Sequence, residues 1–196
     1  MKMFMKILIS TFVVSFLLSM IPFESTCKQL EKDVLRLHII ANSDSVVDQN
    51  LKLLVRDSVQ DTISPLYNDA NSKADALKIT AANLDLVESV AQNAIKRSGF
   101  DYNVSAKIEN KFFDTRYYEN FTMPAGMYDA LVIDIGDAKG RNWWCVMYPA
   151  LCVGASSKIT MKEDLSDSEY SVITDKDVVF KFKIVEYFEK INSLFR

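Results

Sequence analysis

The stretch "VLRLHIIANSDSVVDQNLKLLVRDSV", residues 34–59, changes its hydrophobic period once, and that change decides the fold. Residues 34–41 alternate with a period of two, which is typical of a β-strand. The polar turn "NSDS" (42–45) follows, and Ser45 with Asp48 has the spacing of a helix-capping box. The sequence therefore predicts a strand, a tight turn and a helix, in that order.

The predicted helix has one apolar side and ends before Pro65. Its apolar stripe consists of Val47, Leu51, Leu54, Val55, Val59 and Ile63. Asp48, Lys52 and Arg56 are spaced four residues apart with the acid first, an arrangement that stabilises an exposed helix face. We therefore expect these three side chains on the solvent side of the helix.

The same two periods predict the remaining elements. They are a helix over 72–96, strands over 102–112, 128–135 and 143–148, and a last helix that starts at Thr174. The segment "GDAKGRN" (136–142) is typical of a hairpin loop between the last two strands. The order is β-α-α-β-β-β-α, and strands and helices do not alternate. This order predicts a single α+β domain with a largely antiparallel sheet and helices packed on it.

The N-terminus carries the features of an export signal. Two lysines precede an uncharged apolar run at residues 7–21, the order found in signal peptides. The run is shorter than the roughly 20 residues that a spanning helix needs, and "PFESTC" (22–27) offers no clear small-x-small cleavage site. We expect residues 1–26 to be a signal peptide or membrane anchor, and 27–196 to be one exported domain.

The composition argues against several classes of partner. The chain has 23 Lys and Arg against 26 Asp and Glu, and no basic patch interleaved with aromatics, so nucleic acid is not expected to bind. No Gly-rich phosphate loop or metal-spaced His/Cys set occurs, so we expect no cofactor, no metal and no small-molecule substrate. Asn42, Asp44 and Asp48 could offer oxygen ligands to a cation, but helix capping accounts for them better.

The strip "NWWCVMYPALC" (142–152) holds both tryptophans and two of the three cysteines. Trp143 and Trp144 point to opposite faces of the predicted strand, and both faces are apolar. Either the strand is central and covered on both sides, or one face docks a partner. If the strip is only core, the contact is sought at the "NSDS" turn. The candidate partner-contact residues are therefore Trp143, Trp144, Tyr148, Asn42 and Asp44.

The cysteines allow two further interpretations. A catalytic thiol would need the single histidine, His38, beside Cys145 or Cys152, but Cys145 is predicted to be buried in a strand, where a thiolate is disfavoured. Cys145 and Cys152 could form a disulfide in an oxidising compartment, or remain two buried free thiols. From the residues alone, the sequence predicts an exported protein that is not an enzyme.

Three blocks of sequence resemble the stage II sporulation protein R family of endospore-forming bacteria. They are "LRLHIIANSDSVVDQNLKLLVRDSV" (35–59), "MPAGMYDALVIDIG" (123–136) and "GRNWWCVMYPALC" (140–152). The blocks follow the family's order and span nearly the whole predicted domain. The family usually has two prolines before its second cysteine, where this chain has Pro149 and Ala150.

The resemblance implies a developmental signal. Proteins of this family are made in the forespore and exported into the space between the two septal membranes. There they activate a membrane-embedded aspartic protease that processes the precursor of the mother-cell transcription factor sigma-E. The resemblance implies no catalytic residues. Two other functions remain: a thiol hydrolase using Cys145 or Cys152 with His38, and a carbohydrate-binding module, which needs exposed coplanar aromatic rings.

Overall fold

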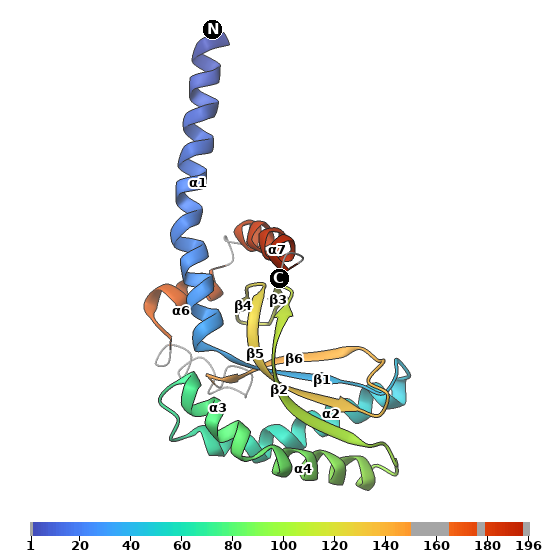
Figure 1. The fold of residues 1–196 in the computed structure, drawn as a ribbon. Coiled ribbons are helices and arrows are strands. Elements are labelled where there is room, and N and C mark those ends of the chain that lie inside the picture. The colour runs from blue at the N-terminus through green and yellow to red at the C-terminus, as the bar shows by residue number, and fades with distance from the viewer. Residues whose placement is uncertain (1, 150–164, 176–178, 194–196) are drawn as a thin grey trace. The chain divides into compact units, whose positions relative to one another are not determined.

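The computed structural model describes residues 2–149, 165–175 and 179–193 (Figure 1). The chain divides into two compact units, which we call the sheet unit and the helical unit. The sheet unit consists of residues 32–111 and 127–165, and the helical unit of residues 1–31, 112–126 and 166–196. The fold is α+β, as predicted.

The main sheet has four strands in the order β2-β5-β1-β6. Their bounds are β1 Leu35–Ile40, β2 Val104–Phe113, β5 Gly126–Ile135 and β6 Asn142–Tyr148. The sheet is mostly antiparallel, as predicted, but β1 runs parallel to β5 and antiparallel to β6. In Figure 1, β1 lies between β5 and β6.

The predicted hairpin between the last two strands is therefore wrong, because β1 separates them. The loop that joins β5 to β6 crosses the end of β1, where Gly140 N–H donates to Ala41 O at 2.8 Å and Lys139 N–H donates to Asn42 O at 3.2 Å. Among the residues that the structure describes, the strand with both tryptophans is consequently an edge strand of the sheet and not a central one.

Three α-helices and a short 3₁₀ helix cover one face of the sheet (Figure 1). Their bounds are α2 Val46–Ile63, η1 Ser64–Tyr67, α3 Lys73–Ala82 and α4 Leu84–Arg97. Ser45 and Ser72 cap α2 and α3 as predicted. The predicted single helix over 72–96 is divided at Asn83, whose side-chain amide donates to Ile79 O at 2.7 Å. Such a side chain competes with the backbone ladder and ends the first helix.

The core of the sheet unit lies between these helices and the sheet. Its fully buried residues include Leu35, Leu37, Ile39, Val55, Val59, Val87, Ala91, Ile95, Leu131 and Ile133. Burying an aliphatic side chain of this size contributes about 1.5–3 kcal/mol. The predicted apolar stripe of α2 is correct except at Val47 and Leu54, which are 57% and 52% exposed.

The helical unit consists mainly of three α-helices. They are α1 Lys2–Asp33, α6 Asp167–Thr174 and α7 Val179–Ser193, and a small antiparallel hairpin joins β3 Arg116–Tyr117 to β4 Thr122–Met123. The predicted start of the last helix at Thr174 is wrong, because Thr174 is the last residue of α6 and α7 begins at Val179. The sequence did not predict α6, although Ser166 and Glu169 form a complete capping box.

Helix α1 continues far beyond the predicted apolar run. It passes through Pro22 without ending, and the predicted boundary between residues 26 and 27 falls inside it. A proline inside a helix costs about 3 kcal/mol. Packing offsets that cost, because Phe23, Cys27 and Leu30 on the following turns are 5%, 1% and 0% exposed.

Candidate interaction surface

The two tryptophans of β6 lie on opposite faces of the sheet, as predicted. Trp143 pairs with Ile39 in register and packs against the core on the helix face. The guanidinium of Arg56 lies 4.3 Å from the Trp143 ring centroid, a cation–π contact. Trp144 pairs with His38 on the other face, where the two rings stack at 3.9 Å and 6°. The two tryptophans cannot form one coplanar platform, so they do not provide a carbohydrate-binding surface of that kind.

His38 is a buried titratable group on the face of the sheet that carries Trp144. The residue is 2% exposed, and Lys111 Nζ lies 3.1 Å from its Nδ1. Burial lowers the pKa of His38 to about 4, although a hydrogen bond with Asn142 opposes that shift. The imidazole is therefore neutral at pH 7 and serves as an aromatic surface for Trp144 rather than as a charge.

Charged side chains occupy the same face of the sheet as His38. Arg36 is fully buried, and its guanidinium lies 5.1 Å from the Tyr128 ring centroid. Lys107 forms ion pairs with Glu109 at 2.9 Å and with Asp134 at 3.4 Å. This face therefore combines aromatic stacking with charge, in contrast to the apolar helix face.

Asn42 and Asp44 hold the loop between β5 and β6 against the end of β1. Asn42 Oδ1 accepts from Asp137 N–H at 2.9 Å, and its amide donates to Asp48 at 2.9 Å. Asp44 Oδ1 accepts from Arg141 N–H at 2.7 Å. The Asp44 and Arg141 side chains, which are 60% and 78% exposed, form a loose ion pair at 3.8 Å. The turn therefore has a structural role, and it also presents an exposed charge pair next to the tryptophans.

The prediction that Asp48 and Lys52 face solvent is wrong, because each is only 4% exposed. Lys52 Nζ donates to Gln49 Oε1 at 2.7 Å and to Arg141 O at 2.8 Å, and burial lowers its pKa. Burial raises the pKa of Asp48, but hydrogen bonds, chiefly from Ser43 and Asn42, outweigh it, so that pKa lies below its usual value. These residues join the turn to the helix, and the described residues contain no cluster of His, Cys, Asp and Glu that could hold a metal ion.

Tyr148 lies on the face opposite to the one that strict alternation predicts. The register between β1 and β6 shifts between Leu35 and Arg36, which pair with Tyr148 and Val146. This bulge carries Tyr148 to the helix face, where it packs against the core and its hydroxyl donates to Ala70 O at 3.4 Å. A bulge re-aims every side chain that follows it.

Cys145 and His38 lie on opposite faces of the sheet. Cys145 pairs with Leu37 and belongs to the core under the helices, where Gln60 Nε2 lies 3.3 Å from its sulfur. The Cys145–His38 hydrolase is therefore excluded by geometry. Cys152 lies outside the described residues, so its pairing with Cys145 stays a prediction.

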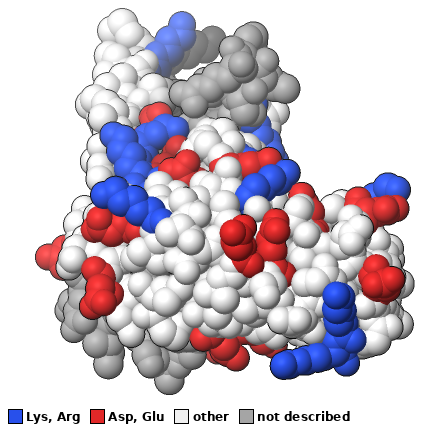
Figure 2. All heavy atoms as spheres, turned by 60° about the horizontal axis from the view of Figure 1, so that its bottom comes forward, with Lys and Arg blue, Asp and Glu red and all other residues white. Residues whose placement is uncertain are grey.

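A shallow groove of about 470 Å³ runs between α2 and α4. Its lining consists of Leu54, Ser58, Thr62, Val90, Asn93, Ala94, Arg97 and Ser98. Figure 2 shows acidic and basic side chains scattered among uncharged ones on one face of the molecule. Arg97 is the one ionisable residue among the described residues of this lining, so the groove offers no acid–base pair for chemistry.

A family model described as stage II sporulation protein R matches residues 31–158, more than half of the chain. The chain belongs to the stage II sporulation protein R family. A stage II sporulation protein R of Bacillus subtilis (strain 168) is 34% identical over 137 residues, which cover 70% of this chain and 61% of that protein. The match thus spans less than two thirds of the relative's length. No solved structure matches the chain.

The family assignment agrees with the three blocks that suggested it. The matched range contains β1, the "NSDS" turn, β5 and β6, and so includes every candidate contact residue. Helices α6 and α7 lie beyond it, as does most of α1. The features that the chain shares with its family therefore lie chiefly in the sheet unit.

Proposed function

We propose that the chain is an exported signalling protein, made in the forespore, that activates a membrane-embedded aspartic protease in the septal membrane. That protease then processes the precursor of sigma-E for the mother cell. Membership of the stage II sporulation protein R family carries this proposal. The apolar helix near the N-terminus supports export or membrane attachment, because signal sequences and anchors have this composition.

The arrangement of side chains favours binding over catalysis. His38 has a lowered pKa, but its ring is stacked against Trp144, and Cys145 lies on the other face of the sheet. Buried titratable groups such as Asp48 and Lys52 have their hydrogen-bonding partners within the fold. A signal of this kind acts through a surface that a partner recognises.

We place the contact with the protease at the end of β6 next to the "NSDS" turn. Trp144 there supplies a partly exposed aromatic ring, a residue type enriched at binding hot spots. Asp44 and Arg141 supply an exposed pair of opposite charges directly before β6 begins, which fits a partner that presents charges of both signs. Trp143 and Tyr148 contact the helices instead, so their contribution is to hold β6 in place.

A reconstituted cleavage assay tests this function. One set of vesicles contains the protease and the sigma-E precursor, and a second set of the same lipid composition contains the full chain. The two sets are mixed, and the amount of cleaved precursor is measured. We expect the wild-type chain to increase cleavage. Asp44→Asn keeps the oxygen that accepts from Arg141 N–H but removes the charge, and it should reduce the increase without changing the melting temperature.

Asp137→Asn is the matched control for that variant. Asp137 lies in the neighbouring loop, is 69% exposed and forms its own ion pair with Lys139 at 2.9 Å. We expect Asp137→Asn to activate like the wild type. Equal activation by both variants would move the contact away from the turn, and no increase in cleavage with the wild-type chain would contradict the proposed function.

A further inference from the structure

Helix α1 joins an exposed apolar segment directly to a buried core. The exposed large apolar side chains between Met3 and Ile21 have exposed fractions of 47% or more. Phe23, two residues after Ile21, is only 5% exposed. The most apolar window of the helix has a mean hydropathy of 2.1 and no buried residue. The helix therefore has one part that packs on protein and one part that does not.

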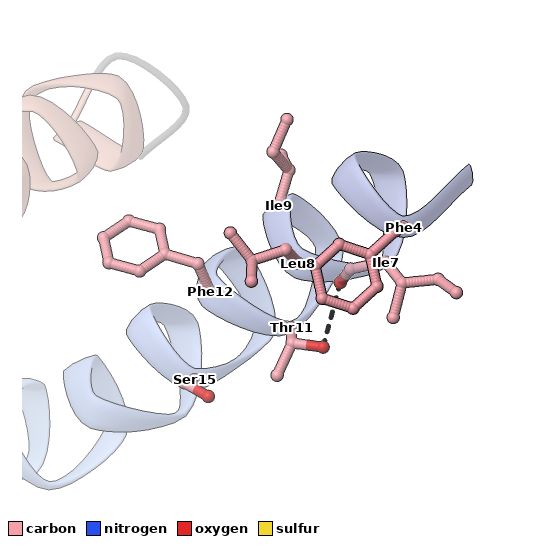
Figure 3. Close-up of a pocket in the computed structure, with 7 residues that line it drawn as sticks. All are labelled: Phe4, Ile7, Leu8, Ile9, Thr11, Phe12 and Ser15. Carbon is pink, nitrogen blue, oxygen red and sulfur yellow. Dashed lines mark hydrogen bonds between the residues drawn. The ribbon is translucent and has the colours of Figure 1, made fainter. Parts of the chain in front are cut away.

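The exposed part is suited to lipid. Residues 3–21 form about 29 Å of helix, close to the roughly 30 Å of a bilayer's hydrocarbon layer. The 15-residue run seen in the sequence was shorter because Lys6 interrupts it, but a lysine near a helix end reaches the interface with its long side chain. Figure 3 shows Ile9 and Phe12 projecting outward from the helix.

Three of the four hydroxyl groups of this segment, those of Ser10, Thr11 and Ser19, donate to backbone carbonyls of the helix itself. Thr11 Oγ1 donates to Ile7 O at 2.9 Å, the dashed contact in Figure 3. Ser10 donates in the same way to Lys6 O at 2.8 Å, and Ser19 to Phe16 O at 2.7 Å. Unsatisfied polar groups are costly in hydrocarbon, so these bonds remove an obstacle to placing the segment in a membrane.

The part that follows belongs to the core of the helical unit. The rings of Phe23 and Phe182 meet edge to face with centroids 5.2 Å apart, and Lys181 Nζ lies 5.6 Å from the Phe23 ring. Cys27 and Val185 complete this cluster. Phe23 and Cys27, which lie just after the apolar segment where a signal peptidase would cut, are thus part of the core of the helical unit.

The sequence after the apolar run offers no signal-peptidase site that would leave the core of the helical unit intact. Signal peptidases require small residues three positions and one position before the cut. Downstream of the apolar run, the first pair in which both residues are small is Ser25 with Cys27. A cut after Cys27 would remove both Phe23 and Cys27 from the cluster that they form with Phe182.

We infer that residues 1–26 are not removed, and that α1 remains as a transmembrane anchor that holds the exported domain at the surface of the membrane. Lys2 and Lys6, at the N-terminal end of the segment, place that end on the cytoplasmic side of the membrane. The anchored domain then diffuses in two dimensions in the membrane from which it was exported. This inference does not depend on the identity of the partner.

The test uses the full chain with a C-terminal tag, expressed in an endospore-forming host. Membranes are washed with alkaline carbonate, and the intact mass of the tagged protein is measured in pellet and supernatant. We expect the protein in the pellet with the mass of the complete chain, 22.3 kDa plus the tag. A shortened wild-type chain, whether it starts after Cys27 or earlier, would overturn the inference.

A cleavable variant provides the matched control. Met20→Ala with Pro22→Ala creates an Ala-x-Ala site directly before Phe23, so the core residue stays with the mature chain. We expect this variant to lose 22 residues and to appear in the carbonate supernatant, while the wild type in the same host stays intact. This mass difference is independent of protease activation, so failure of the anchor and failure of the proposed function are distinguishable.

Discussion

Acidification provides a direct test of the structure around His38. The neutral ring stacks on Trp144 at 3.9 Å and lies beside the Lys111 ammonium, so the folded protein resists protonating it. The pKa of His38 falls from 6.5 to about 4 mainly because the ring is buried. The unfolded chain therefore binds this proton more readily than the folded chain between these two pH values.

The direction of the effect follows from that difference. The stability contributed by the neutral ring is fully present above pH 6.5 and is lost as the pH falls toward 4. The difference between 6.5 and about 4 corresponds to about 3 kcal/mol. We expect a loss of about 1–2 kcal/mol in the free energy of unfolding between pH 7 and pH 5, once solvent screening is included.

The assay is urea unfolding of the detergent-solubilised chain at pH 7, 6 and 5, followed by tryptophan fluorescence. The chain has a single histidine, and both tryptophans lie on β6, so the signal is local and the titration is specific. His38→Phe keeps an aromatic ring for Trp144 but cannot be protonated, and it should lose most of the slope between pH 7 and 5. A flat wild-type profile, or an equal slope in the variant, would refute the reasoning.

Other predictions follow from single contacts. A Cβ at Gly140 would clash with the backbone oxygen of Ser43 in the turn. A Cβ at Gly99 would meet nothing within 4 Å, but the backbone there has a φ of +83°. Gly140→Ala should therefore lower the free energy of unfolding by about 3 kcal/mol and Gly99→Ala by about 1 kcal/mol, measured by urea unfolding, and equal losses would contradict the close contact. Trp144→Ala should reduce activation of precursor cleavage by more than its change in melting temperature would explain. Full activation by this variant would show that Trp144 does not belong to the contact surface. Val14→Asp with Leu17→Asp should keep a tagged chain in the cytoplasm, because each charge costs about 2.5–3.5 kcal/mol in the middle of the segment; fractionation that finds it exported would contradict the compartment.

Local signals in the sequence predicted the elements correctly where they were independent of distant contacts. The alternation at 34–41 and the caps at Ser45 and Ser72 reappear in the structure as β1, α2 and α3. Each of these features depends on residues within one strand or one helical turn. Gly99 likewise follows α4 with a positive φ, as a glycine past a helix end should.

Features that depend on distant residues were not predictable from the same patterns. Lys52 looks like a surface lysine by spacing, but it is buried because its ammonium bonds to Arg141 O, 89 positions along the chain. The insertion of β1 between β5 and β6 also depends on long-range pairing, which no local period reports. α6 is a different case, because its capping box at Ser166 and Glu169 is a local signal that the predicted order of elements omits.

The candidate surface was predictable in part. Alternation placed Trp143 and Trp144 on opposite faces, and the structure confirms this. It failed at Tyr148, because a bulge shifts the register after Val146. The stacking partner of Trp144, His38, is set by pairing between two strands more than 100 residues apart in sequence, so only the structure could identify it.

The most direct test of the central claim, that this protein signals through a surface without chemistry of its own, is precursor cleavage measured with and without the protease. Vesicles carrying the sigma-E precursor receive the full chain alone, the protease alone, or both. The account predicts strong cleavage only when both are present. With the protease, a folded chain that carries His38→Phe and Cys145→Ser should give the same cleavage as the wild-type chain. Cleavage by the chain without the protease, or loss of activation in that folded double variant, would contradict it.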